Sequence, residues 1–174
     1  ACGEDLGMIP ATVPQVMDDL RILSLEIQRM PKSVEETFAH PANYPYLSVC
    51  TTSTHDMNPI RAWWEEDRQV TNDFWQMILG NQGEAPYFCE PWICRQILEQ
   101  HVWSPAMLTI LPLQDWLSMD AQLRREDPNT ERINVPANSR HYWHYRMHLT
   151  VEKLAAAKEF NETLGGMIAS SGRK

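Results

Sequence analysis

The residues best suited to chemistry are a histidine and an aspartate, His55 and Asp56, which follow a short apolar run closed by hydroxyl side chains. Residues 46–50 are aromatic and β-branched and come directly after Pro45, so they predict a strand. At the carboxyl ends of parallel barrel strands, polar side chains are typical of a functional site, where they can bind substrate or transfer protons. A structural alternative stays open, in which Asp56 caps the following helix and His55 bonds within a loop.

Two adjacent carboxylates, Glu4 and Asp5, form a second candidate, because Gly3 and Gly7 on either side let the backbone approach closely. Adjacent residues on a strand point to opposite faces. At most one of the two carboxylates can therefore face a given site, and we expect the scaffold to hold the other.

The elements that must position these residues alternate between helices and short apolar runs, as in a parallel sheet of the α/β class. The predicted helices are 12–23, 58–79 and 90–101, and the predicted strands are 23–30, 46–50 and 106–111. Thr12 and Pro14 mark the start of the first helix, whose apolar face should pack on the sheet. Residues 106–111 are almost all apolar, so we expect both faces of that strand to be covered. A last amphipathic helix begins with Thr150 as its cap.

Several aromatic side chains could form a platform for stacking sugars or could simply fill the core. Helical spacing favours the core for the tryptophans of the second helix, which are Trp63, Trp64 and Trp75. The same interpretation, packing, applies to Tyr142, Trp143 and Tyr145.

The four cysteines are scattered, and Cys89 and Cys94 have a C-x4-C spacing at the outer limit for zinc, with no second ligand pair nearby. His141, His144 and His148 are spaced i, i+3 and i+7, with no carboxylate or thiol to complete a metal site. We predict no metal and no cofactor. Free thiols are typical of a reducing compartment, so the predicted location is cytoplasmic.

The bulk composition excludes several classes of partner. The 174 residues suit one domain, and 43% hydrophobic content is enough for a core. A net charge of −8 argues against a nucleic-acid or anionic-membrane surface. No apolar run approaches the roughly 18 residues of a membrane span.

Four motifs, taken in order, give the chain a family resemblance. They are Gly3-Glu4-Asp5-Leu6-Gly7, Thr54-His55-Asp56, Pro112-Leu113-Gln114-Asp115, and Arg132-Ile133-Asn134-Val135-Pro136 followed by Tyr142-Trp143. With these motifs the chain resembles, over essentially its whole length, the amylomaltase family of 4-α-glucanotransferases, which are also called disproportionating enzymes.

The resemblance implies roles for particular residues. Glu4 would be the general acid/base, and Asp56 the carboxylate that stabilises the transition state. His55 and Asn134 would bind sugar hydroxyls of an α-1,4-glucan or maltooligosaccharide, a neutral substrate that needs no steering charge. We expect Arg132 to be a scaffold ion-pair residue first and a ligand second. The family nucleophile is an aspartate on an earlier strand, and no residue here matches its motif.

The same resemblance implies that residues 1–174 are the C-terminal portion of a (β/α)8 TIM barrel, incomplete in this chain. A complete barrel takes about 250 residues, and no apolar strand precedes Glu4. We therefore expect a fragment of a larger catalytic domain that is inactive by itself. Either two copies associate through their open strand edges, or the N-terminal residues including Glu4 are disordered.

Two other functions remain open for this sequence. An α-amylase-type glycoside hydrolase would use the same acid/base and stabilising carboxylate, but water would be the acceptor. A non-catalytic glucan-binding or interaction protein would expose its aromatic residues and would tolerate Glu4→Gln.

Overall fold

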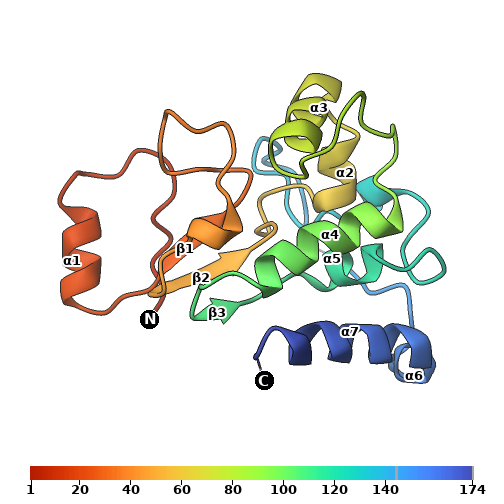
Figure 1. The fold of residues 1–174 in the computed structure, drawn as a ribbon. Coiled ribbons are helices and arrows are strands. Elements are labelled where there is room, and N and C mark those ends of the chain that lie inside the picture. Colours follow the sequence, from red (N-terminus) through yellow and green to blue (C-terminus); the bar gives the residue numbers. More distant parts are fainter. Residues whose placement is uncertain (144, 174) are drawn as a thin grey trace.

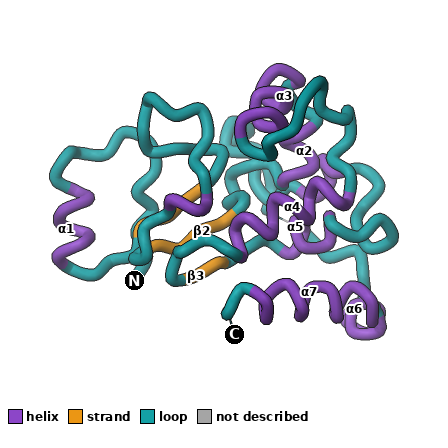
Figure 2. Tube along the Cα trace, in the orientation of Figure 1, coloured by secondary structure: helices purple, strands orange, loops and turns teal. Residues whose placement is uncertain are grey.

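The computed structural model describes residues 1–143 and 145–173, which form a small parallel sheet with helices beside it (Figures 1 and 2). The strands lie in the order β1-β2-β3, and both pairs are parallel. Their bounds are Ser24–Ile27 for β1, Ser48–Thr51 for β2 and Leu108–Thr109 for β3. The parallel α/β arrangement predicted from the alternation of elements is therefore confirmed.

The first residues extend the sheet beyond β1 by one isolated bridge, in which Cys2 lies parallel to Leu23. The Gly3 N–H donates to the Leu23 carbonyl at 2.9 Å, and the Leu23 N–H donates to the Ala1 carbonyl at 2.9 Å. Glu4 follows this bridge directly.

The strands β1 and β2 are shorter than the predicted runs for reasons visible in their turns. The carbonyl of Tyr46 accepts bonds from the N–H groups of Ser48 and Met107, so β2 begins two residues later than predicted. The N–H of Met30 turns back to the carbonyl of Ile27, which ends β1. All four residues of β2 are buried, as expected for a central strand.

The expectation for 106–111 is wrong in extent and in burial. Only Leu108–Thr109 pairs as β3, and Leu108 and Ile110 are 45% and 60% exposed. These side chains are two residues apart and share one face of the strand. Both side chains are therefore only partly covered, whereas Ala106, two residues before Leu108, is buried.

The first helix, α1 (Val13–Asp19), is also shorter than predicted and packs poorly. Thr12 and Pro14 mark its start as predicted, with Thr12 as the N-cap and Pro14 in the first turn, but the Thr12 side chain makes no capping bond. Met17 is its buried residue, while Val16 and Leu20 are exposed. The helix lies at one end of the molecule, away from the other helices (Figure 1).

The helix predicted over 58–79 is two helices, α2 (Ile60–Trp64) and α3 (Arg68–Met77). The break occurs because Asp67 caps α3, its side chain accepting the backbone N–H groups of Gln69 and Val70. The expected burial of the tryptophans is confirmed, since Trp64 and Trp75 belong to the main apolar core and Trp63 packs against it.

The helix α4 (Pro91–Val102) agrees with its prediction within one residue. Its apolar stripe joins the main core through Ile93 and Leu98. The helix α5 (Leu113–Ser118), directly after β3, was not predicted.

The last predicted helix is divided at Ala157 into α6 (Val151–Ala156) and α7 (Lys158–Ser170). Thr150 caps α6 as expected, its side chain accepting the N–H of Lys153. Short 3-10 helices at Pro41–Asn43 (η1) and Pro128–Glu131 (η2) complete the regular structure of the described residues.

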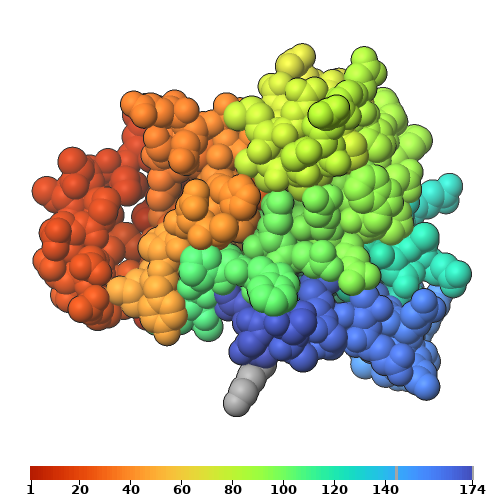
Figure 3. Space-filling model, in the orientation of Figure 1, coloured from red at the N-terminus to blue at the C-terminus, as the bar shows by residue number. Residues whose placement is uncertain are grey.

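The helices α2 to α7 lie on one side of the sheet (Figure 1), and the N-terminal segment with α1 forms the opposite end of the molecule (Figure 3, red). The helix α7 runs beside α4, where Met167 enters the main core. Within the described ranges, no helix has the length and apolar character needed to cross a bilayer.

Candidate functional site

Three of the four predicted site residues meet after the end of β2. The side-chain amide of Asn134 donates to Asp56 Oδ1 at 2.6 Å, although the two residues are 78 positions apart. His55 Nε2 lies 3.4 Å from the same oxygen. The backbone N–H of Asn134 donates to the His55 carbonyl at 3.1 Å, so the two segments are joined by backbone as well as by side chains.

Asp56 does not cap the following helix, which contradicts the structural alternative for this residue. The N-cap position of α2 is Pro59, and the Ile60 N–H donates instead to Asp115 Oδ1 at 2.8 Å. The carboxylate of Asp56 is therefore left for Asn134 and His55.

Arg132 organises this junction through backbone carbonyls. Its Nε donates to the Asn134 carbonyl at 2.8 Å, and its Nη2 lies 3.5 Å from the Asp56 carbonyl. The expectation of a scaffold ion pair is wrong for the described residues, where these carbonyls are its partners.

Trp143 borders the junction, with its ring centroid 4.8 Å from that of His55 and the rings tilted by 42°. It is 58% exposed, and Tyr142 is more exposed still. Packing was therefore the wrong interpretation for these two aromatic residues. His144, which lies next to them and was considered as a metal ligand, is outside the described residues.

The two N-terminal carboxylates differ in burial, as expected if the scaffold holds only one of them. Asp5 is buried, with Lys32 Nζ at 2.6 Å from Oδ2 and the Leu25 N–H donating to Oδ1 at 2.8 Å. Glu4 is exposed. The scaffold thus holds one carboxylate and leaves the other exposed, and no contact within the described part of the chain joins Glu4 to Asp56.

Asp115 fixes both ends of the loop that carries His55 and Asp56, a role that was not predicted. It is fully buried and accepts the hydroxyls of Thr52 at 2.5 Å and Ser53 at 2.8 Å, besides the Ile60 N–H. Burial raises the pKa of Asp115, and these bonds oppose that rise. Its position after an apolar strand was visible in the sequence, but its partners were not.

Arg29 holds the same loop from the other side. Its Nη2 donates to the carbonyls of Thr52 at 2.9 Å and Asn58 at 2.8 Å, and its guanidinium lies 4.9 Å from the ring of Trp63. Burial lowers the pKa of Arg29 to about 10, so the side chain remains charged at neutral pH.

Glu131, which directly precedes the Arg132–Asn134 segment, is a second buried carboxylate. It is 1% exposed, and Arg61 Nη1 lies 3.9 Å from its carboxylate. Burial raises the pKa of Glu131 to about 7, while Arg61 opposes the rise. The Gln114 side chain donates to the backbone carbonyl of Glu131 at 3.2 Å, which ties the Arg132–Asn134 segment to α5.

A cavity of about 470 Å³ adjoins the junction, lined by amide, carboxylate, guanidinium and phenol groups from Asn58, Glu65, Glu66, Tyr87, Asn129 and Arg132. Such groups both donate and accept hydrogen bonds, as a hydroxyl-rich ligand requires. Burial raises the pKa of Glu65.

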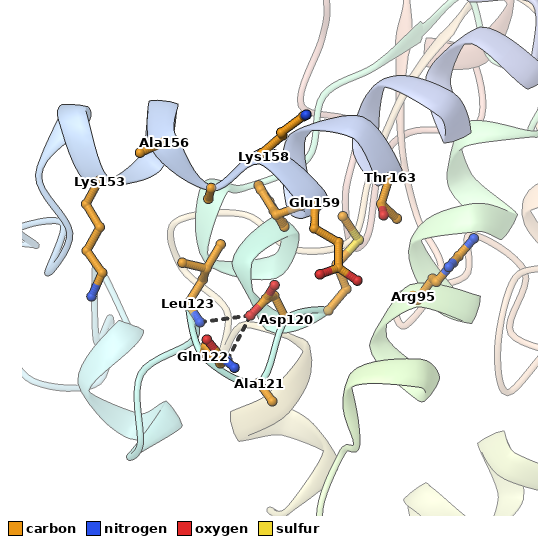
Figure 4. Close-up of a pocket in the computed structure, with 13 residues that line it drawn as sticks. Arg95, Asp120, Ala121, Gln122, Leu123, Lys153, Ala156, Lys158, Glu159 and Thr163 are labelled. Atoms are coloured by element: carbon orange, nitrogen blue, oxygen red, sulfur yellow. Dashed lines mark hydrogen bonds between the residues drawn. The ribbon is translucent and has the colours of Figure 1, made fainter.

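A separate cavity of about 650 Å³ lies between α7 and residues 119–123 (Figure 4). Charged side chains of both signs line it. The Asp120 carboxylate there accepts hydrogen bonds from the backbone N–H groups of Gln122 and Leu123. None of the predicted site residues lines it.

The described residues contain no group of three or more histidine, cysteine or acidic side chains arranged to hold a metal ion. Cys89 and Cys94 are buried free thiols with their sulfurs 3.3 Å apart, and Cys50 is also buried and free. The expectation of free thiols is confirmed, and Cys2 is the exposed one of the four.

Comparison with known proteins shows which family has a similar sequence. A family model described as 4-alpha-glucanotransferase matches residues 1–150. A 4-alpha-glucanotransferase DPE2 from Oryza sativa subsp. japonica is 42% identical over 173 residues, covering 99% of this chain and 18% of the relative. A 4-alpha-glucanotransferase from Chlamydia muridarum is 31% identical over 168 residues, covering 95% of this chain and 31% of the relative.

Solved structures agree at the level of the fold. An amylomaltase from Streptococcus agalactiae, in complex with acarbose, superposes with a TM-score of 0.71 at 18% identity, covering 99% of this chain and 32% of that one. An amylomaltase from Corynebacterium glutamicum gives a TM-score of 0.62 at 17% identity, with 99% and 28% covered. The chain thus spans less than a third of the length of these relatives, and it belongs to the 4-alpha-glucanotransferase family.

Proposed function

We propose that this chain supplies part of the active site of a 4-α-glucanotransferase, which transfers α-1,4-glucan segments between maltooligosaccharides. The observation that carries the proposal is the 2.6 Å contact between Asn134 and Asp56, which joins two of the motifs behind the family resemblance. The cavity beside it, with its amide and carboxylate lining, suits a ligand rich in hydroxyls.

The proposed reaction is a retaining double displacement. A carboxylate nucleophile attacks the anomeric carbon and forms a glycosyl ester, while Glu4 gives its proton to the departing glycosidic oxygen. Glu4 then takes the proton of an acceptor sugar hydroxyl as that oxygen displaces the ester. No residue of this chain matches the family's nucleophile motif, so the proposed mechanism needs a carboxylate from outside this sequence.

Asp56 is proposed to stabilise the positive charge that develops on the sugar ring in both steps. His55 and Asn134 are proposed to hold sugar hydroxyls next to it. One N–H of the Asn134 amide bonds to Asp56, and the amide oxygen accepts the Val135 backbone N–H at 2.9 Å. The second N–H of the amide is the donor proposed to meet a sugar.

We further propose that residues 1–174 are the C-terminal portion of a (β/α)8 barrel. Support comes from the parallel sheet flanked by helices, the partly exposed apolar side chains at β3 and the fraction of each relative that the chain spans. A reducing, cytoplasmic setting is proposed from the buried free thiols.

The test is a chimera in which residues 1–174 replace the matching segment of the Oryza sativa relative. The chimera should redistribute maltotriose without a net gain of reducing ends. Glu4→Gln should lower kcat by about 10²–10⁴-fold through loss of proton transfer. Asp56→Asn should lower kcat by about 10²–10³-fold through loss of charge stabilisation.

Glu35→Gln, on an exposed residue, is the matched control and should leave the rate unchanged. A net gain of reducing ends would identify a hydrolase instead. Normal rates in both the Glu4 and Asp56 variants would reject the assigned roles.

A further inference from the structure

A small cavity beside the Arg132–Asn134 segment gathers positive charge. It measures about 210 Å³, and its polar lining residues are Arg125, Arg132, Arg146, His141, Tyr142 and Tyr145. Thr130 and Ile133 complete the lining, so no aspartate or glutamate among the described residues lines it. Three guanidinium groups around one cavity repel one another unless an anion neutralises them.

This cluster of positive charge contrasts with the net charge of the whole chain, which is −8. Elsewhere many basic side chains are paired with acids, as Lys32 is with Asp5 and Arg95 with Glu99. Glu131, which lies in the sequence between the lining residues Thr130 and Arg132, is buried and already faces Arg61. Its pKa of about 7 leaves it only partly ionised at neutral pH, so it cannot balance three arginines.

Donors near the cavity are held in place but are not fully used. The Arg125 guanidinium donates through Nη2 to the Arg146 carbonyl and lies 5.6 Å from the ring of Tyr145. Among the described residues, the buried Nε of Arg125 has no acceptor and the buried hydroxyl of Tyr145 has no acceptor for its proton. A buried donor without an acceptor is costly, and an oxyanion would supply acceptor oxygens to both.

We propose that this cavity binds a phosphate group, either as inorganic phosphate or as the phosphate ester of a sugar. The planar guanidinium fork matches the geometry of phosphate oxygens, and the phenol adds a neutral donor. The volume accommodates a tetrahedral anion with a small substituent.

Arg132 connects this cavity to the junction at Asp56. It lines both the 210 Å³ and the 470 Å³ cavities, and its Nε donates to the Asn134 carbonyl. A phosphate group bound to Arg132 would restrain the segment that holds Asp56. The binding itself does not rest on the proposed glucanotransferase activity and is measured without it.

The experiment is calorimetric titration of the 174-residue chain with potassium phosphate, with glucose 6-phosphate and with glucose, at constant ionic strength in potassium chloride. Saturable binding of phosphate or of glucose 6-phosphate is expected, and glucose should show none. Tighter binding of the ester would identify a sugar phosphate as the ligand, and equal or weaker binding would identify inorganic phosphate.

Variants locate the site. Arg146→Gln removes an exposed guanidinium of the cavity and should weaken phosphate binding by about 10-fold, and Tyr145→Phe by about 5-fold, since each removes one hydrogen bond to a charged ligand. Arg140→Gln removes the same charge from the same segment outside the cavity and should change the affinity by less than about 2-fold. Circular dichroism should show that all three variants keep the fold.

Absence of saturable binding of both phosphate compounds would overturn the proposal. Equal weakening by Arg146→Gln and Arg140→Gln would also overturn it, because that result indicates non-specific attraction to net charge.

Discussion

At the scale of single residues, the loop of His55 and Asp56 depends on side chains that take no part in the proposed chemistry. The Asp115 carboxylate accepts hydrogen bonds from the hydroxyls of Thr52 and Ser53, directly after β2, and from the first N–H of α2. Arg29 donates to two carbonyls of the same loop. Their burial leaves no water to replace these bonds, so each loss should be felt as stability and as position.

Asp115→Asn tests this support. The amide presents donors where the carboxylate accepted the hydroxyls of Thr52 and Ser53, so the free energy of unfolding should fall by about 1–3 kcal/mol. Urea unfolding followed by tryptophan fluorescence measures the change. Asp19→Asn, on the exposed end of α1, is the control and should shift the midpoint little. Equal effects of the two variants would contradict a supporting role for Asp115.

Glu131 predicts a pH dependence of stability. Its pKa is raised from 4.5 to about 7 in the folded chain, so the folded state binds the proton more tightly than the unfolded state does. The contribution of Glu131 to stability is therefore fully present below pH 4.5 and is lost as the pH rises to about 7.

Glu131→Gln should remove this part of the pH dependence. Between pH 5 and pH 8 the wild-type chain should lose about 1–3 kcal/mol more stability than the variant does. Urea unfolding at several pH values measures both slopes. Glu84→Gln, on an exposed residue, should keep the wild-type slope. Parallel slopes for wild type and Glu131→Gln would contradict the raised pKa.

At the scale of elements, the break between α2 and α3 decides how the tryptophans enter the core. Asp67 accepts the first free N–H groups of α3, which lets the chain change direction between Trp64 and Trp75. These two rings then meet at 6.4 Å in an edge-to-face arrangement, which one straight helix would place differently.

Asp67→Ala should lower the free energy of unfolding by about 0.5–2 kcal/mol through loss of the cap. Asp73→Ala, within α3, is the control and should cost less because it loses only a surface pair with Gln69. Chemical denaturation measures both variants. A larger loss from Asp73→Ala would show that the cap is not what holds the break.

At the scale of the whole molecule, β3 is an edge strand with partly exposed apolar side chains. Leu108 and Ile110 are exposed together, and the strand pairs within the described residues with β2 alone. An exposed apolar edge invites pairing with another chain, and burying such a surface stabilises the association.

We therefore expect the isolated chain to self-associate and to be inactive on maltotriose. Size-exclusion chromatography with light scattering should show species larger than a monomer, and Ile110→Lys should shift them toward the monomer. Val34→Lys, at another exposed apolar residue away from the strand, is the matched control and should not. A monodisperse wild-type monomer that redistributes glucans would contradict both expectations.

Local patterns in the sequence determined the elements whose causes are local. The helix α4 was predicted within one residue, because Pro91 starts it and its apolar stripe is continuous along one stretch. The cap at Thr150 and the parallel alternation of elements were predicted for the same reason. The expectation that the scaffold holds only one of Glu4 and Asp5 needed only that the two residues are adjacent, and the structure agrees although neither residue lies in a strand.

The family resemblance brought Asp56, His55 and Asn134 together as candidates, but no local pattern could place Asn134 on Asp56. The two residues are 78 positions apart, and they meet because two separate segments fold together beyond the carboxyl end of β2. The partners of Asp115 lie 55 to 63 residues away for the same reason.

Tertiary structure alone decided which apolar residues are covered. Periodicity shows that side chains share a face, but burial of that face depends on what packs against it, and for α1 and β3 little does. The charge of the arginine cavity is likewise invisible along the chain, because Arg125, Arg132 and Arg146 converge only when their segment curls back on itself. The sequence determined the elements and the candidate residues, and the fold determined their neighbours, because contacts between distant segments form only when the whole chain packs.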